Sequence, residues 1–429
     1  MLARTSQLRV TLSAPRTVRL VDKQDGVFDL DLDVAAAAQR AVVKIEALGA
    51  TGELLAWGET PPFVLGPISA DLAVFVAPPQ SFGLSPAQFA PARDQMGATA
   101  LSFGALFAGG LDVAGVVRGD VEIYNAYTHS FQVGKPLPQA RVAPTVAANG
   151  TPMVFVFGGE DSARQAAAGG WMFDTSVTPA GEYFDVVSDV AAPAGQVALP
   201  IANSGSNRFA LSGPTALLLD GASLSAVALV PTVAVPASGA TVIANNAVTA
   251  FFVGERVSSP VSERVSSPIV KIDSAGIAAE LADITAARRT GHAVIGRGVD
   301  LLIVGGGSTA QLAGSILRID TTTMVATSFD NALHPPRRNA AVALAGAGRW
   351  LIVAGGLDAS EPDPVTVLQT ADVFDAVTLL RVAQLPLARA RTGARAISLA
   401  NGQVLLAGGL DALGQPIAEV ELFTPSAMP

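Results

Sequence analysis

At 429 residues, with 50% hydrophobic and only 15% charged side chains, the chain is too long for one ordinary domain and too apolar to be disordered. Its 42 glycines and 28 prolines exclude a long coiled coil and favour short strands separated by turns. The net charge of -9 argues against nucleic acid or an anionic membrane surface as the main partner, and the absence of cysteine excludes disulfides and thiolate chemistry.

The first 70 residues are predicted to form a small β-sandwich-like domain. In the predicted strand over 27–34, Asp29, Asp31 and Asp33 alternate with apolar residues, which is typical of a strand with one face in water. Their carboxylates are expected to form a row rather than to encircle a calcium ion, so we predict no metal site. The other strands are predicted at 7–12, 17–20, 41–48 and 54–57.

Two apolar stretches, 97–117 and 213–244, are long enough to cross a membrane. Both are rich in turn-forming and small residues, so we predict buried strands and no membrane span. The sequence begins without the apolar stretch of a secretory signal. The Ala-rich, Lys-poor composition suggests a high-GC bacterial source, and we expect the periplasm, the outer surface or the secreted fraction, with a cytoplasmic protein as the alternative.

Glycine pairs recur about every 50 residues, each at the end of an apolar run. The gap between the pairs at 158 and 305 equals three such steps, so two degenerate units are expected there, at 208–213 and 250–254. A second strand follows downstream of the pairs, as at 121–125, 316–320, 371–375 and 419–423. The paired glycines are Gly109, Gly110, Gly158, Gly159, Gly305, Gly306, Gly355, Gly356, Gly408 and Gly409.

This pattern resembles the kelch repeat, whose units are four-stranded blades of a β-propeller. The resemblance covers residues 72–429 and implies an all-β fold of about seven blades. The glycine pairs are interpreted as packing and turn devices rather than phosphate-binding loops, because no helix pattern follows them. The usual Tyr and Trp positions of the family are mostly replaced here.

The last unit is one strand short, and a strand near 71–77 is predicted to complete its blade and so to close the ring. The domains are therefore predicted as 1–70 and 71–429. The hexad ERVSSP occurs twice between residues 255 and 268, and this duplication predicts a surface loop.

No catalytic motif is found in the sequence. The three histidines, His129, His292 and His334, lie in different units and do not have the spacing of a metal site. Galactose oxidase and its relatives share the kelch propeller, but their cofactor requires a cysteine joined to a tyrosine, which excludes that class. We therefore predict no catalytic residue, no metal and no cofactor.

An arginine lies 16 to 18 residues before each glycine pair, and this series is the best candidate for a ligand site. In one interpretation the arginines line one mouth of the channel and bind an anion. In the other, which we favour, each pairs with a turn acid, Asp112, Asp161, Asp358 or Asp411, and joins neighbouring blades. The five arginines are Arg93, Arg141, Arg288, Arg337 and Arg391.

The leading functional hypothesis is a non-enzymatic binding or scaffold protein that presents a propeller loop face to a protein or glycan partner. The alternative is a lectin for acidic sugars, or an enzyme similar to the sialate mutarotases, which are also kelch propellers, acting in an arginine-lined channel.

Overall fold

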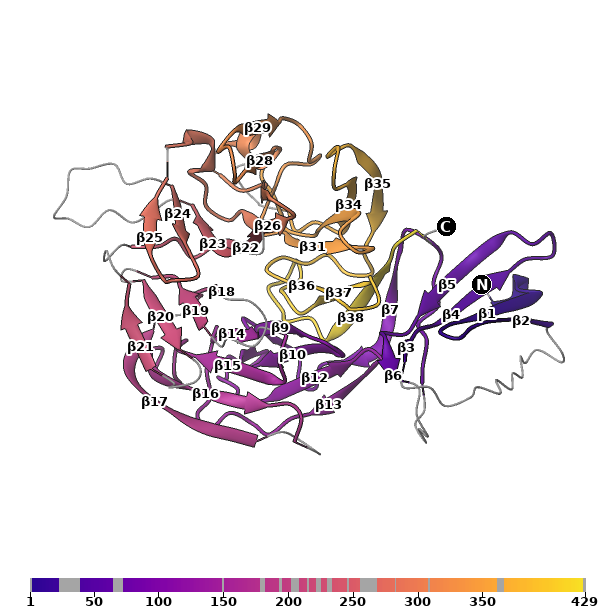
Figure 1. The fold of residues 1–429 in the computed structure, drawn as a ribbon, viewed down its shortest axis with the longest axis horizontal. Helices are drawn as coiled ribbons and strands as arrows, with labels where there is room; N and C mark the ends of the chain where they lie inside the picture. The colour runs from indigo at the N-terminus through magenta and orange to yellow at the C-terminus, as the bar shows by residue number, and fades with distance from the viewer. Residues whose placement is uncertain are drawn as a thin grey trace.

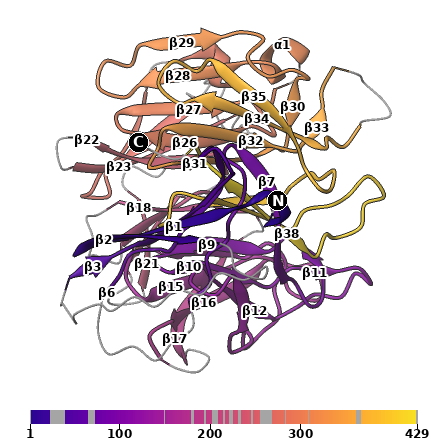
Figure 2. The same cartoon turned by 90° about the vertical axis from the view of Figure 1, so that its right-hand side faces the viewer.

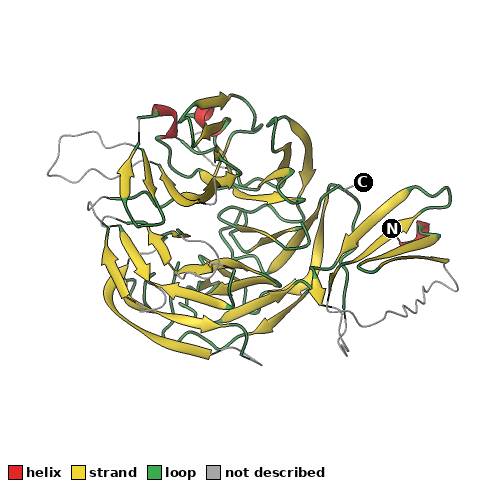
Figure 3. Ribbon diagram, viewed as in Figure 1, coloured by secondary structure: helices red, strands yellow, loops and turns green. Residues whose placement is uncertain are grey.

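The structure is a computed structural model in which nearly all regular structure is β-strand (Figure 3). Short helical turns occur at Leu2–Arg4, Thr285–Ala287 and Ala310–Ala313 (α1). The structure describes residues 2–22, 39–64, 72–148, 150–177, 182–192, 195–201, 208–213, 216–220, 225–229, 234–244, 247–254, 268–281, 283–307, 309–360 and 366–426.

The N-terminal region forms a four-stranded antiparallel sheet in the order β2-β1-β4-β5 and a two-stranded ribbon of β3 and β6. The predicted strands at 7–12, 17–20, 41–48 and 54–57 all fall within it. The predicted strand at 27–34 and its aspartates lie outside the described residues, so the β-sandwich stays a prediction. The bounds are β1 Gln7–Ser13, β2 Arg16–Asp22, β3 Arg40–Ala41, β4 Val43–Leu48, β5 Leu54–Glu59 and β6 Phe63–Val64.

The rest of the described chain forms seven four-stranded antiparallel sheets, which we number in chain order. Sheets 1 to 4 contain β9 Gly97–Leu101, β10 Gly104–Ala108, β12 Val121–Asn125 and β13 Ser130–Val133; β14 Thr145–Ala148, β15 Met153–Phe157, β16 Ala167–Asp174 and β17 Glu182–Ala192; β18 Ala198–Pro200, β19 Arg208–Leu211, β20 Leu217–Asp220 and β21 Ser225–Ala228; and β22 Gly239–Ala244, β23 Ala247–Val253, β24 Ile269–Ile272 and β25 Ala278–Glu280.

Sheets 5 to 7 contain β26 Ala293–Arg297, β27 Asp300–Val304, β28 Ile316–Asp320 and β29 Ala326–Phe329; β31 Ala341–Ala345, β32 Trp350–Ala354, β34 Thr370–Asp375 and β35 Arg381–Pro386; and β36 Arg395–Ser398, β37 Val404–Ala407, β38 Glu419–Thr424 and β7 Ser81–Gln88. The two units without a glycine pair supply the second strands of sheets 3 and 4, at the positions predicted for them. Two short ribbons pair β8 Arg93–Asp94 with β11 Leu111–Asp112, and β30 Arg337–Arg338 with β33 Leu357–Asp358.

The sheets form a closed ring (Figure 1). The first strands of neighbouring sheets contact one another in the order β9, β14, β18, β22, β26, β31 and β36, and β36 contacts β9 again. The fold is therefore a β-propeller whose first strands surround the centre.

The core lies between neighbouring sheets. The second strands are mostly apolar, and β32 is buried along its whole length, because each sheet is covered on both faces. At one such interface Leu302 and Val304 of sheet 5 pack with Leu351 and Val353 of sheet 6. Burial of these strands between sheets is the main source of stability for a radial array.

The ring is closed by β7, which pairs with β38 so that Phe82 lies opposite Phe423. The prediction of a closing strand at 71–77 is wrong in its position. Of that segment, residues 72–77 are described, and there Ala77 bridges to Trp57 of the N-terminal sheet. The true strand contains Gly83 and Pro86, which are unusual within strands but are tolerated in β7 because it is the outer strand of its sheet.

The N-terminal sheet lies beside sheet 7 and projects in front of the ring when the molecule is turned (Figure 2). Tyr127 of sheet 1 donates from its hydroxyl to the carbonyl of Pro62 at 2.9 Å, which ties the N-terminal region to the ring. Among the described residues, no helix has the length and apolar character needed to cross a membrane. Residues 255–267, most of the duplicated hexad, lie outside the described residues.

Candidate functional site

Four of the five predicted site arginines are buried inside the sheets. Arg93, Arg337 and Arg391 have no exposed surface, and Arg141 is 1% exposed. Arg337 pairs with Asp372 at 2.8 Å and Arg391 pairs with Glu421 at 2.7 Å. The guanidinium of Arg93 binds Glu122, and that of Arg141 lies 4.9 Å from the ring centre of Trp171 and donates to the carbonyl of Ala168.

Arg337 and Arg391 join neighbouring sheets through the glycine pairs. The backbone carbonyl of Arg337 accepts from the amide of Gly306 in sheet 5 at 3.0 Å. Its guanidinium donates to the carbonyl of Gly355 in sheet 6 at 3.1 Å. Arg391 repeats this arrangement with Gly356 and Gly408, one sheet further on. Through these contacts Arg337 and Arg391 each bind two neighbouring sheets.

The partners of these arginines differ from the predicted ones. The paired carboxylates belong to the third strands of the sheets, at Glu122, Asp372 and Glu421. The turn acids instead cap their own loops, since each accepts backbone amides a few residues downstream. These acids are Asp112, Asp161, Asp358 and Asp411.

In sheet 5 the buried position belongs to Arg289 and not to the predicted Arg288. Arg289 is 1% exposed and donates to the carbonyls of Gly305 and Leu312, both at 3.0 Å. Burial lowers its pKa to about 10. Arg288 lies nearer the surface and pairs with Asp283 at 3.0 Å. Because the two arginines are adjacent, the spacing in the sequence could not show which of them occupies the repeated position. In the structure it is Arg289 whose side chain is buried at the sheet interface.

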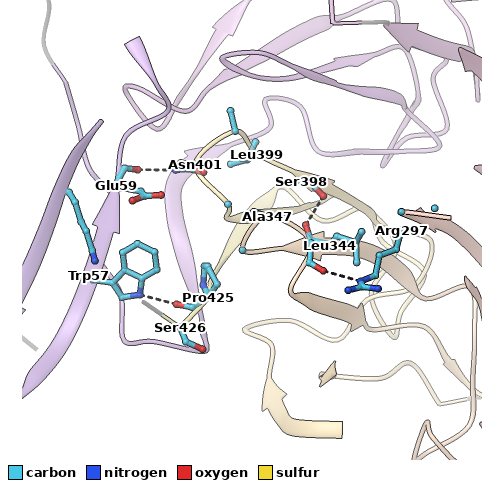
Figure 4. A pocket seen from close by; sticks show the side chains of 17 residues that line it. Trp57, Glu59, Arg297, Leu344, Ala347, Ser398, Leu399, Asn401, Pro425 and Ser426 are labelled. Atoms are coloured by element: carbon cyan, nitrogen blue, oxygen red, sulfur yellow. Dashed lines mark hydrogen bonds between the residues drawn. The ribbon is translucent and has the colours of Figure 1, made fainter. Parts of the chain in front are cut away.

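A recess of about 750 Å³ opens between the N-terminal sheet and the ring (Figure 4). It lies on the turn face, which we define as the face that carries the turns between first and second strands. Turns of sheets 5, 6 and 7 form one wall, and β5 and β4 form the other. Its lining includes Lys44, Trp57, Glu59, Arg297, Leu344, Ala347, Ser398, Ala400, Asn401 and Ser426.

Hydrogen bonds across the recess hold its two walls together. The indole of Trp57 donates to the carbonyl of Pro425 at 2.8 Å, and the side-chain amide of Asn401 donates to the carbonyl of Glu59 at 3.0 Å. In Figure 4 Trp57 and Glu59 lie on one side, while Ser398 and Arg297 lie on the other. The recess is thus a preformed site at a boundary between structural units, a frequent location for ligand pockets.

Charged groups of both signs line the recess. Burial raises the pKa of the Glu59 carboxyl. The ammonium of Lys44 lies 5.3 Å from the centre of the Trp57 ring, and Arg297 donates to the carbonyl of Gly348 at 3.3 Å. The walls therefore offer donors and acceptors around an apolar surface.

A second cavity of about 430 Å³ lies in the centre of the ring. It is lined by the first strands β9, β14, β18 and β36, and Ser398 lines both this cavity and the recess. The recess therefore lies at one mouth of the channel. The arginine that lines this cavity is Arg395, which sequence reasoning missed because two other arginines, Arg389 and Arg391, precede it in the same short segment.

The described residues contain no cluster of metal-ligating side chains. His129 is buried, accepts from the amide of Phe75 at 3.1 Å through Nε2, and lies 2.7 Å from the hydroxyl of Tyr124. His129 therefore fastens the segment before β7 to sheet 1.

Acidification is expected to destabilise the protein through His129. Burial lowers its pKa to about 4, whereas an unfolded histidine titrates near 6.5. As the pH falls between these values, the unfolded state binds a proton that the folded state does not, so His129 lowers the free energy of unfolding by up to about 1.4 kcal/mol per pH unit. Burial also lowers the pKa of His292 to about 4, so this second histidine adds a similar contribution to the slope of the wild type. Urea unfolding at pH 7, 6 and 5 measures this slope. In His129→Gln about one proton fewer is taken up on unfolding, so the dependence of the free energy of unfolding on pH should be weaker. An unchanged dependence would contradict the lowered pKa of His129.

No protein-family model matches the chain, and no curated protein matches it. Among solved structures the chain is similar to one titled "Structure of YjhT", with 12% sequence identity and a TM-score of 0.46. The match covers 79% of this chain and 96% of that one.

Proposed function

We propose that the chain is a non-enzymatic binding protein that presents the turn face of its propeller, with the recess as ligand site, to a glycan. The observation that carries this proposal is the recess itself. Its volume of about 750 Å³ lies within the usual range for ligand sites and is large enough for a short oligosaccharide. Hydrogen bonds between its two walls fix its shape.

The chemistry of the walls favours a glycan over an apolar ligand. Sugar hydroxyls need both donors and acceptors, and Lys44, Glu59, Arg297 and Ser426 supply them next to glycine-rich turns. A protein loop is the competing occupant, and its binding would bury more of the turn face than the recess alone.

We also propose that the repeats are of the kelch type. Glycine pairs follow the second strands β10, β15, β27, β32 and β37, and a third strand follows each of them. The four buried arginines of the predicted set are bound within the propeller, and Arg288 pairs with Asp283, so we do not propose an acidic-sugar site made of these five residues.

A blocking substitution tests the recess. Ala400 is exposed in the turn of sheet 7 and lines the recess, so Ala400→Trp should fill it without removing any bond of the fold. Among neutral oligosaccharides screened by thermal shift and titration calorimetry, we expect at least one to bind the wild type and to lose at least ten-fold in affinity in this variant.

The matched control is Ala163→Trp, in an exposed turn on the opposite face of the ring. It should bind like the wild type. If both variants bind the glycan equally well, the glycan binds outside the recess. If no oligosaccharide binds, the glycan hypothesis is wrong and a protein partner of the turn face should be sought by pull-down.

A further inference from the structure

The residue that begins the first strand is small in six of the seven sheets. Here the strands converge on the centre, where small side chains leave the channel open. The seventh sheet alone has a long, charged side chain at this position, Arg395. The small residues are Gly97, Thr145, Ala198, Gly239, Ala293 and Ala341.

This exception distinguishes Arg395 from the arginines of the repeat. Arg391 and its equivalents recur in five of the seven sheets, and their guanidinium groups are bound by backbone carbonyls or by third-strand carboxylates. Arg395 has no such equivalent, so the repeat does not account for it.

The guanidinium of Arg395 makes few contacts with the described residues. Its Nε donates to the carbonyl of Met96 at 3.3 Å, and among the described residues no carboxylate pairs with it. The side chain keeps exposed surface in the channel cavity, where the surrounding first strands replace much of the bulk water. This desolvation lowers the pKa of Arg395, and a positive charge in such a place gains from a bound counter-anion.

We infer that the channel holds an anion-binding site in which Arg395 binds the oxyanion group of a small ligand, a carboxylate or a phosphate, through its planar fork of donors. Other polar side chains also line this cavity. Thr99 comes from sheet 1 and Ser398 from sheet 7, and the cavity of about 430 Å³ accommodates a small molecule. The site is separate from the proposed glycan site, although Ser398 lines both cavities.

The test titrates inorganic phosphate and acetate separately into the full chain in a low-salt buffer, followed by calorimetry and thermal unfolding. We expect one of them to bind the wild type, to raise the melting temperature, and to bind more weakly as ionic strength increases. Arg395→Gln should lose at least ten-fold in affinity for the anion. The affinity of Arg395→Lys should lie between those of the wild type and Arg395→Gln, since lysine keeps the charge but lacks the planar set of donors of the guanidinium. The anion that binds identifies the ligand class.

Arg389→Gln is the control, because Arg389 is exposed, pairs with Glu419 and lies outside the cavity; it should bind like the wild type. Without anion, Arg395→Gln should melt no lower than the wild type. The inference is overturned if neither anion binds the wild type. It is also overturned if Arg395→Gln binds the anion as well as the wild type does. Because Ala400→Trp fills only the recess, it should keep the anion, which separates this test from that of the glycan site.

Discussion

Replacing Arg391 by methionine is expected to lower the free energy of unfolding by about 3–5 kcal/mol. The side chain is fully buried, and its partner Glu421 is 1% exposed, so the substitution leaves a buried carboxylate without its cation. Among the described residues, Glu421 would keep only its bond from the amide of Ala388, at 2.8 Å. The bond from Arg391 to the carbonyl of Gly408 would be lost as well. Urea unfolding of the purified variant measures the change.

The same segment supplies a matched control. Arg389 pairs with Glu419 at 2.9 Å, two residues before each member of the buried pair, but both side chains are partly exposed. Arg389→Met should therefore cost less than about 1 kcal/mol. The double variant Arg391→Met with Glu421→Gln should recover part of the loss, because it removes the buried charge. Equal losses for Arg389→Met and Arg391→Met would show that burial of the pair does not matter.

Substituting Gly355 by alanine is expected to lower the free energy of unfolding by about 2–5 kcal/mol. Its φ of +62° lies in the left-handed region, where an alanine costs about 1–2 kcal/mol. A Cβ would also collide with the backbone carbonyl of Arg391 in the next sheet, and overpacking of this kind adds about 1–3 kcal/mol. Chemical unfolding of the variant gives the total.

Gly393 separates these two contributions. Its φ of +67° is similar, yet a Cβ there would meet nothing within 4 Å. Gly393→Ala should therefore show only the backbone cost of about 1–2 kcal/mol. If Gly355→Ala were no worse than Gly393→Ala, the close approach between neighbouring sheets would not contribute to stability.

The sequence predicted the propeller because its signals are local. A buried apolar run followed by a glycine pair marks a second strand wherever it occurs, so β27, β32 and β37 could be placed directly. The position of the closing strand was missed because β7 contains Gly83 and Pro86, whereas the neighbouring segment at 72–77 alternates like a strand but packs against the N-terminal sheet.

The sites could not be predicted in the same way. The recess combines Trp57, Arg297, Ala347 and Ala400, which come from four distant segments and form no motif. The repeat suggested Arg391 as a site residue, but an arginine that recurs at the same place in several sheets has a structural role. Arg395 carried a weaker signal: it stands at a position where the other units have small residues, but that position is known only once the first strands are aligned in space.

The pairing of β7 with β38 also has a consequence for biosynthesis. Sheets 1 to 6 are each built from one continuous segment and can form soon after that segment leaves the ribosome. Sheet 7 must wait, because β7 is made before all of them and its partner β38 after all of them. Until translation is nearly complete, the growing chain is an open arc with an unpaired strand at its start and an apolar sheet face at its end. Both surfaces are prone to aggregation, so the nascent chain, more than the finished ring, is the form that needs protection in the cell.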